Sequence, residues 1–139
     1  MTPYTKPLPR IDDANAPHWQ GAKAREVRVQ KCQSCSTLRY PPARQCAQCL
    51  SEKSEWVTLA GTGEVWSHGT FHRAYFKGFE QDMPYTVVLV KMDEGAMLFS
   101  NLVGVARDAV RIGMRVRAVF DDVTEEVTLI KFVPDGSAR

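Results

Sequence analysis

The sequence lacks any run of about 18 consecutive apolar residues, the length that crosses a bilayer as a helix. Residues 1–10 contain no apolar stretch of the kind found in the core of a signal peptide. The sequence also lacks a large excess of one charge, because 18 Lys and Arg residues stand against 16 Asp and Glu residues. We therefore expect a soluble cytoplasmic protein with no membrane partner. The near balance of charge argues against a dedicated DNA-binding protein.

Cysteine is scarce and occurs only as two C-x-x-C pairs, Cys32 with Cys35 and Cys46 with Cys49, with ten residues between the pairs. Two such pairs at this spacing predict four thiolates at the corners of a tetrahedron. Zinc suits this donor set best, and iron, as in rubredoxin, is an alternative that would use the same four sulfurs. Two disulfides are disfavoured in the reducing compartment that we expect.

The predicted site leaves little room for chemistry at the metal. Four thiolates saturate tetrahedral zinc, so the ion is predicted to be structural. Because every cysteine is a predicted ligand, no thiol remains as a nucleophile. His68 and His72 lie in a predicted strand, where a separation of four residues is about 13 Å and too long for a shared metal. We predict no catalytic residue in this chain, which has no Gly-rich phosphate loop or serine-nucleophile elbow.

The remaining pattern predicts a mainly β protein. Residues 1–15 carry three prolines and are predicted to form an extended arm, followed by a helix near residues 16–24 with Trp19 as its anchor. A strand is expected over residues 26–31. Five later segments have the composition of strands: 63–71, 85–92, 96–103, 114–120 and 127–133. With one or two helical turns at 105–110, this order predicts a five-stranded OB-fold barrel.

These elements divide the chain into three expected parts: an N-terminal arm and helix (1–31), a zinc ribbon (32–59) and an OB-fold domain (60–139). Charge differs between the halves. Residues 1–59 hold nine basic and five acidic residues (+4), whereas residues 60–139 hold nine basic and eleven acidic residues (−2). The ribbon half is therefore predicted to be the better surface for an anion.

Several short motifs follow one another between about residues 17 and 133. They are Cys32-x-x-Cys35, Tyr40-Pro41-Pro42-Ala43-Arg44, Cys46-x-x-Cys49, Gly61-Thr62-Gly63-Glu64-Val65, Ser67, Thr70, His72-Arg73-Ala74, Pro84-Tyr85, Asp93-Glu94-Gly95 and Gly113-Met114-Arg115-Val116. In this order they resemble the zinc-ribbon plus OB-fold family of acyl-CoA-associated proteins. The chain departs from the family at Ser36 and Ala47, where family members often have Gly and Pro.

The resemblance implies a fold with an N-terminal helical segment, a rubredoxin-like zinc ribbon and a C-terminal OB barrel. It also implies an accessory subunit of a thiolase-like enzyme that cleaves or transfers acyl groups of CoA thioesters by thiolysis, acyl transfer or retro-aldol chemistry. Because CoA carries phosphates that suit guanidinium and ammonium groups, the candidate CoA or acyl-CoA contacts are Arg39, Arg44, Arg73 and Lys77.

A nucleic-acid-binding module is the alternative, since zinc ribbons and OB folds both recur in that role. Aromatic residues that could stack on bases are Trp66, Phe71, Tyr75, Phe76 and Phe79. The net charge of −2 in residues 60–139 opposes a phosphate backbone. We therefore expect the exposed aromatics to meet a protein instead.

Overall fold

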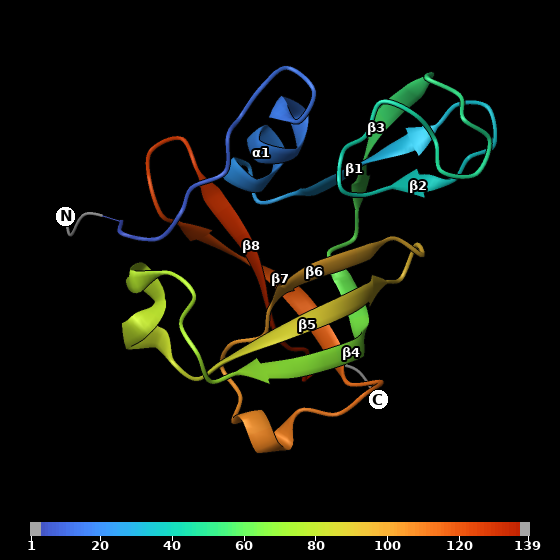
Figure 1. The fold of residues 1–139 in the computed structure, drawn as a ribbon. Helices are drawn as coiled ribbons and strands as arrows, with labels where there is room; N and C mark the ends of the chain where they lie inside the picture. Colours follow the sequence, from blue (N-terminus) through green and yellow to red (C-terminus); the bar gives the residue numbers. More distant parts are fainter. Residues whose placement is uncertain (1–3, 137–139) are drawn as a thin grey trace.

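The computed structural model describes residues 4–136 as a short helix, a three-stranded sheet and a five-stranded barrel (Figure 1). The first three residues of the predicted arm and the last three of the predicted OB-fold domain lie outside the described residues. In chain order the elements are α1 (Ala16–Lys23), β1 (Val27–Cys32), β2 (Leu38–Arg39), β3 (Ser54–Leu59), β4 (Thr62–Phe71), η1 (Lys77–Asp82), β5 (Tyr85–Met92), β6 (Met97–Asn101), η2 (Arg107–Ala109), β7 (Arg115–Asp122) and β8 (Thr128–Pro134).

Helix α1 confirms the predicted helix but not its predicted anchor. Asn15 precedes the helix, and Pro17 lies in the first turn, where the missing N–H has no intrahelical partner to lose. His18, Gly21 and Ala22 are the buried residues, whereas Trp19 is only partly buried. Positions separated by three and four residues share one helix face, so His18 lies at the centre of the buried face, and Trp19, three residues before Ala22, lies at its edge. Among residues 4–136, no helix has the length and apolar character that a membrane crossing requires.

The smaller sheet has the order β2-β1-β3 and forms the base of the ribbon. β1 pairs with β3 in antiparallel register along its whole length, from Val27 opposite Leu59 to Cys32 opposite Ser54. Val27 and Val29 are buried by this pairing and by the barrel beneath it. One end of β1 therefore reaches the apolar core, and its other end delivers the first cysteine.

The larger sheet has the order β6-β5-β4-β7-β8. A parallel bridge between Leu102 and Phe132 brings the two edge strands together and nearly closes the barrel. All five predicted strands are present, with β6 ending at Asn101 before the predicted end at residue 103. The predicted helical turns at 105–110 are the short 3-10 helix η2. The OB-fold architecture is confirmed.

One continuous apolar core joins the ribbon base to the barrel. Its buried members come from both sheets and from the segments on either side of β6: Val27, Val29, Leu59, Val65, Val88, Val90, Met92, Ala96, Leu98, Leu102, Val110, Val116 and Phe132. Phe132 is fully buried and is the largest side chain of the core. Because the two sheets share this core, burial of apolar surface stabilises them together.

The tight turn between β5 and β6 holds distant parts of the barrel in place. Both carboxylate oxygens of Asp93 accept hydrogen bonds from the Arg115 guanidinium at 2.7 Å, and the Thr62 hydroxyl donates to Asp93 at 2.5 Å. The next residue, Glu94, accepts a hydrogen bond from the Ala60 N–H at 2.7 Å. The turn thus fastens β4 and β7 at their first residues. Hydrogen bonds from Arg115 and Thr62 lower the pKa of Asp93 from 3.8 to about 2.

Replacing Asp93 tests this clamp. A lowered pKa stabilises the fold above pH 3.8, and this stabilisation is lost as the pH falls through about 2. We expect Asp93→Asn to lower the free energy of unfolding by about 1 kcal/mol at pH 7, a value reduced by the partial exposure of the pair. Urea titrations should show the difference from wild type shrinking towards zero near pH 2. Asp108→Asn, which removes an exposed carboxylate with no hydrogen bond among the described residues, should have no effect at either pH.

Candidate functional site

Two cysteine turns of the same backbone form lie at the tip of the ribbon. We call residues 32–37 the first knuckle and residues 46–51 the second knuckle. The Ser36 N–H donates to the Cys32 carbonyl at 2.9 Å, and the Leu50 N–H donates to the Cys46 carbonyl at 2.9 Å. Ser36 and Leu50 share a φ of 65°, a conformation that favours glycine. Ser36 therefore adopts the backbone for which glycine is better suited.

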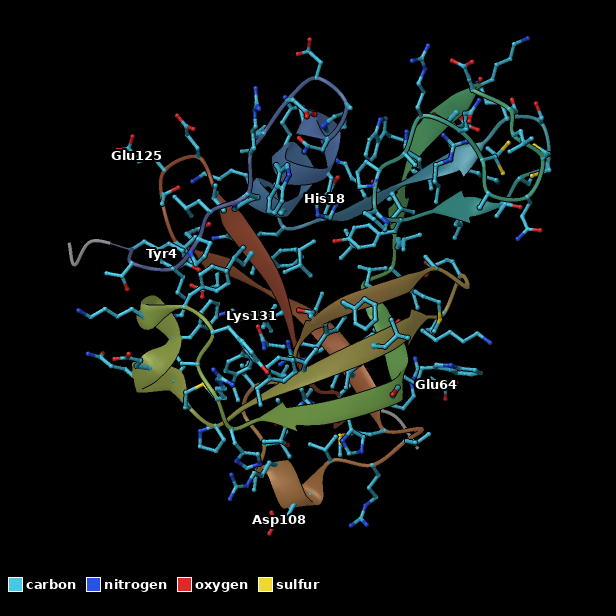
Figure 2. All side chains as sticks on the ribbon, in the orientation of Figure 1. Tyr4, His18, Glu64, Asp108, Glu125 and Lys131 are labelled. Atoms are coloured by element: carbon cyan, nitrogen blue, oxygen red, sulfur yellow. The ribbon has the colours of Figure 1, made fainter. Side chains whose placement is uncertain are left out.

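The four cysteine sulfurs converge between the knuckles, where Figure 2 shows the yellow sulfur atoms at the upper right. All four Sγ atoms lie within 4.8 Å of one another. The Sγ atoms of Cys32 and Cys49 are 3.6 Å apart, as are those of Cys35 and Cys46, and none forms a disulfide. A tetrahedral ion with metal–sulfur bonds of about 2.3 Å needs sulfur separations of about 3.8 Å. The residues present therefore fit a structural zinc ion.

Backbone N–H groups prepare the site for negatively charged sulfur. Cys35 and Ser34 supply backbone hydrogen bonds that lower the pKa of Cys32 to about 6. In the second knuckle, backbone hydrogen bonds from Cys49 and Gln48 lower the pKa of Cys46. Thiolates are the metal-binding form of cysteine, so the backbone at Cys32 and Cys46 favours the protonation state that zinc requires. At Cys49 the backbone hydrogen bond from Ser51 acts in the same direction, but the three neighbouring sulfurs outweigh it and raise the pKa of this thiol to about 12.

Arg39 has a structural place inside the ribbon. Arg39 is only 7% exposed, and its guanidinium donates to the Ala43 carbonyl at 2.8 Å and the Ser51 carbonyl at 3.4 Å. Nε of Arg39 is buried and has no hydrogen-bond partner. These bonds connect β2 to the segment before the second knuckle and to its last residue. Arg39 thus supports the metal site from inside rather than offering a charge at the surface.

The other three candidate CoA contacts are exposed but are not brought together. Arg44 lies before the second knuckle and pairs with Glu52 at 3.1 Å. Arg73 lies 5.4 Å from the ring centroid of Tyr75, and Lys77 begins η1. Figure 1 shows the ribbon and η1 on opposite sides of the molecule. The structure thus separates Arg44 from Arg73 and Lys77.

A second feature of the surface is the outer face of strands β4, β5 and β6, which we call the outer sheet face and define by Trp66, Val87, Leu89, Lys91 and Phe99. Trp66 is 50% exposed and Phe99 is 71% exposed. Leu89 lies opposite Phe99 in the register, and Lys91 Nζ is 4.9 Å from the centroid of the Trp66 ring. The apolar side chains of this face point away from the barrel core and are exposed or partly buried.

The sequence pattern could have identified Phe99 before the structure did. Alternation along β6 buries Leu98, so its neighbour must point outward. Trp66 is harder to assign because the register of β4 against β5 shifts between Val65 and Ser67. A bulge changes which residues share a face, and no local sequence signal marks this one. The sequence identifies Trp66 as an aromatic residue, whereas its position against Lys91 on this face depends on the bulge.

The described residues contain one group of His, Cys, Asp and Glu side chains arranged to hold a metal, and it is the four-cysteine site. His68 and His72 are both exposed; His68 lies within β4, and His72 directly follows the last residue of that strand. Phe71 and Phe79, two of the aromatic residues considered for stacking on bases, pack against the ring of Tyr85. The Phe71 and Tyr85 rings stack at 5.3 Å, and the Phe79 and Tyr85 rings lie 5.4 Å apart.

Cys46→Ser tests the metal site. We expect the variant to lose bound zinc, because a serine hydroxyl does not replace a thiolate ligand. Residues 32–51 should then lose protection from hydrogen exchange, whereas β4 to β8 should keep theirs because their core is apolar. Elemental analysis and hydrogen-exchange mass spectrometry measure the two effects, with Gln48→Ala, an exposed change in the same knuckle, as the control. Equal loss of protection in the barrel would contradict the expectation, and iron in the wild-type protein would identify the other metal.

Ser36→Gly tests the backbone strain of the first knuckle. Glycine adopts a φ of 65° without the steric cost that a Cβ atom brings, so we expect the variant to gain about 1 kcal/mol in stability. Thermal unfolding of the zinc-loaded protein measures the gain. Gln33→Gly is the control, because Gln33 is exposed in the same knuckle and has no positive φ. A gain in both variants, or in neither, would show that strain at Ser36 is not the cause.

Two family models match the chain one after the other. The rubredoxin-like zinc ribbon domain of ChsH2 matches residues 19–55, and the C-terminal OB-fold domain of ChsH2 matches residues 56–121. Among solved structures, the chain is 41% identical to a chain described as Ltp2-ChsH2(DUF35) aldolase, with a TM-score of 0.80 over 91% of this chain and 98% of that one. A DUF35 protein of unknown function from Sulfolobus solfataricus shares the fold at 17% identity, with a TM-score of 0.61 over 88% of this chain and 86% of that one.

Curated relatives carry names from CoA metabolism and from scaffolding. The chain is 41% identical over 129 residues to a probable enoyl-CoA hydratase alpha subunit of Thermomonospora curvata, covering 93% of this chain and 40% of that protein. It is 35% identical over 104 residues to the 3-oxo-4,17-pregnadiene-20-carboxyl-CoA hydratase alpha subunit of Mycobacterium tuberculosis, covering 75% of this chain and 32% of that protein.

A shorter relative matches over most of its length. The chain is 31% identical over 110 residues to a DUF35 domain-containing scaffold protein of Methanocaldococcus jannaschii, covering 78% of this chain and 77% of that protein. The chain thus spans less than half of each hydratase subunit and about three quarters of the scaffold protein. Both domain models match in the order found in the structure, and the chain therefore belongs to the ChsH2 family of proteins with a rubredoxin-like zinc ribbon and a C-terminal OB-fold domain.

Proposed function

We propose that the chain is a non-catalytic zinc-binding subunit of a thiolase-like acyl-CoA enzyme complex. The complex would cleave or transfer the acyl group of a CoA thioester by thiolysis, acyl transfer or retro-aldol chemistry. The observation that carries this proposal is the likeness to a chain solved under the name of an Ltp2-ChsH2 aldolase, which this chain covers over 98% of that chain's length. The scaffold name of a shorter relative supports an assembly role.

The arrangement of the cysteines supports a subunit without a nucleophile of its own. All four thiols converge on one point and fit a saturated structural zinc site. A thiol bound to a structural metal is not available to form a thioester. The reacting cysteine of a thiolase-like reaction would therefore come from the partner subunit, and this chain would contribute binding surface.

The outer sheet face is the surface that we assign to the partner subunit. It carries two exposed aromatic side chains, Trp66 and Phe99, with Leu89 between the strands that hold them. Aromatic residues are enriched in the centres of protein interfaces. Lys91 Nζ lies over the Trp66 ring and places a cation at the border of this apolar surface. An apolar partner surface that covers this face would remove both rings from water.

Arg73 and Lys77 are the better pair for a CoA phosphate. Both are exposed, four residues apart, at the segment that leads into η1. Arg44 is also exposed but lies on the ribbon and already pairs with Glu52. We propose that Arg73 and Lys77 meet the phosphates of CoA bound mainly by the partner, and that Arg44 makes a separate contact.

Co-purification with an affinity-tagged chain tests the subunit proposal. We expect a thiolase-like chain at a fixed ratio, together with CoA-dependent cleavage of β-keto or β-hydroxy acyl thioesters by the complex and none by the isolated chain. Phe99→Asp should weaken the complex at least about tenfold, because an ion would be buried in an apolar interface. Ile112→Asp, an equally exposed change outside the outer sheet face, should leave the complex intact.

Three results would contradict the proposal. The first is turnover of an acyl thioester by the homogeneous chain alone. The second is equal binding of the partner by the Phe99→Asp and Ile112→Asp variants, which would remove the outer sheet face from the interface. The third is recovery of nucleic acid in place of a thiolase-like chain, which would favour the nucleic-acid-binding alternative.

A further inference from the structure

A cavity of about 780 Å³ lies between the N-terminal arm, η1, the segment after β6 and the first part of β8. Its size lies within the range of small-molecule sites, about 300 to 1,000 Å³. Figure 2 shows Tyr4 and Lys131 on the side of the molecule where η1 lies, and both residues line the cavity. Neither the metal site nor the proposed CoA contacts contribute to its lining.

The walls of the cavity suit an apolar ring system. Three aromatic side chains line it, Tyr4, Phe79 and Tyr85. The Phe79 and Tyr85 rings lie 5.4 Å apart at an angle of 35°, so the two rings form one continuous apolar wall. Leu102 and Leu129 add aliphatic surface. Aromatic walls favour a flat or ring-shaped ligand, because stacking adds to the burial of apolar area.

The charges of the lining favour an anion. Lys6, Arg107 and Lys131 are basic, whereas Asp82 is the one acidic residue among the lining residues, a balance of +2. Lys6 pairs with Asp82 at 2.5 Å, and Lys131 pairs at 2.8 Å with Asp121 outside the lining. The Arg107 guanidinium has no hydrogen bond or ion pair with another described residue. It is therefore free to bind a ligand carboxylate.

The arm forms one wall of the cavity. We call residues 4–7 the strap. Lys6 Nζ lies 5.5 Å from the ring centroids of both Tyr4 and Phe79, which ties the strap to η1. A Cβ atom on Gly78 would lie 3.0 Å or less from backbone atoms of Thr5 and Lys6. The strap therefore keeps this path only because residue 78 has no side chain.

We propose that this cavity is a binding site for an organic anion with an apolar ring body. The ring packs among Tyr4, Phe79 and Tyr85, and the anionic group meets Arg107. The strap completes the site. The site uses residues that the proposed subunit function does not use, and the isolated chain is sufficient to form it. Failure of the partner experiment would therefore leave this site untouched.

The first experiment compares an anionic probe with a neutral one of the same shape. The full zinc-loaded chain, labelled with ¹⁵N, is titrated with 2-naphthoate and separately with 2-naphthamide. We expect naphthoate to shift the backbone amides of Thr86, Leu102 and Leu129, which line the cavity. Naphthamide should bind about tenfold more weakly, because it lacks the charge that pairs with a guanidinium. Equal affinities, or shifts confined to the outer sheet face, would overturn the proposal.

Two pairs of variants locate the site. Arg107→Gln should weaken naphthoate binding about tenfold, whereas Arg111→Gln, an exposed arginine outside the cavity lining, should not. Gly78→Ala should displace the strap and weaken both probes, whereas Gly69→Ala adds a Cβ atom with nothing within 4 Å and should weaken neither. Amide spectra of each variant confirm that the barrel stays folded. Equal loss in the members of either pair would overturn the assignment of that wall.

Discussion

Mutual repulsion of four converging thiolates is the constraint on which the ribbon depends. Sulfur atoms within 4.8 Å of one another cannot all be ionised unless a cation lies between them. The knuckle segments also offer little apolar surface, since Cys32 and Cys46 are the buried residues of the two turns. The metal therefore supplies the stabilisation that a hydrophobic core supplies elsewhere in the chain. Arg39 and the backbone N–H groups around the sulfurs hold the two knuckles in the shape that this site requires.

The base of the ribbon is nevertheless packed against the barrel. Val27, Val29 and Leu59 belong to the same core as the barrel, so burial of apolar area sets the position of the ribbon base. A bidentate ion pair adds to this, since the Arg25 guanidinium meets Asp122 of β7 at 2.8 and 2.6 Å. The zinc site stands at the far end of β1. A partner bound to the ribbon and a partner bound to the outer sheet face would thus contact two parts of one packed unit.

Features that depend on residues close together in the sequence can be predicted from it, whereas contacts between distant residues cannot. The cysteine pairs and the strand pattern are encoded within a few residues, and the zinc ribbon and the five barrel strands were predicted correctly. The clamp of Asp93 on Arg115 joins residues 22 positions apart, and Arg25 meets Asp122 across 97 positions. No local pattern records such pairs. The burial of Arg39 depends on where the second knuckle folds back, and the cavity needs the strap, η1 and β8 together, so neither could be inferred from spacing.

The equivalence of the two knuckles shows which of their positions the metal site depends on. Residues 32–37 and 46–51 are buried and exposed at equivalent positions and have the same turn hydrogen bond. In both, the residue after the second cysteine has a left-handed backbone conformation. Yet, apart from the cysteines, no pair of equivalent positions in the two knuckles carries the same residue. The metal site is thus specified by backbone shape and sulfur, in two interchangeable copies. The side chains at positions 33, 34, 47 and 48 are exposed and make neither the turn hydrogen bonds nor the sulfur ligands, so this surface can change its chemistry while the metal site stays intact.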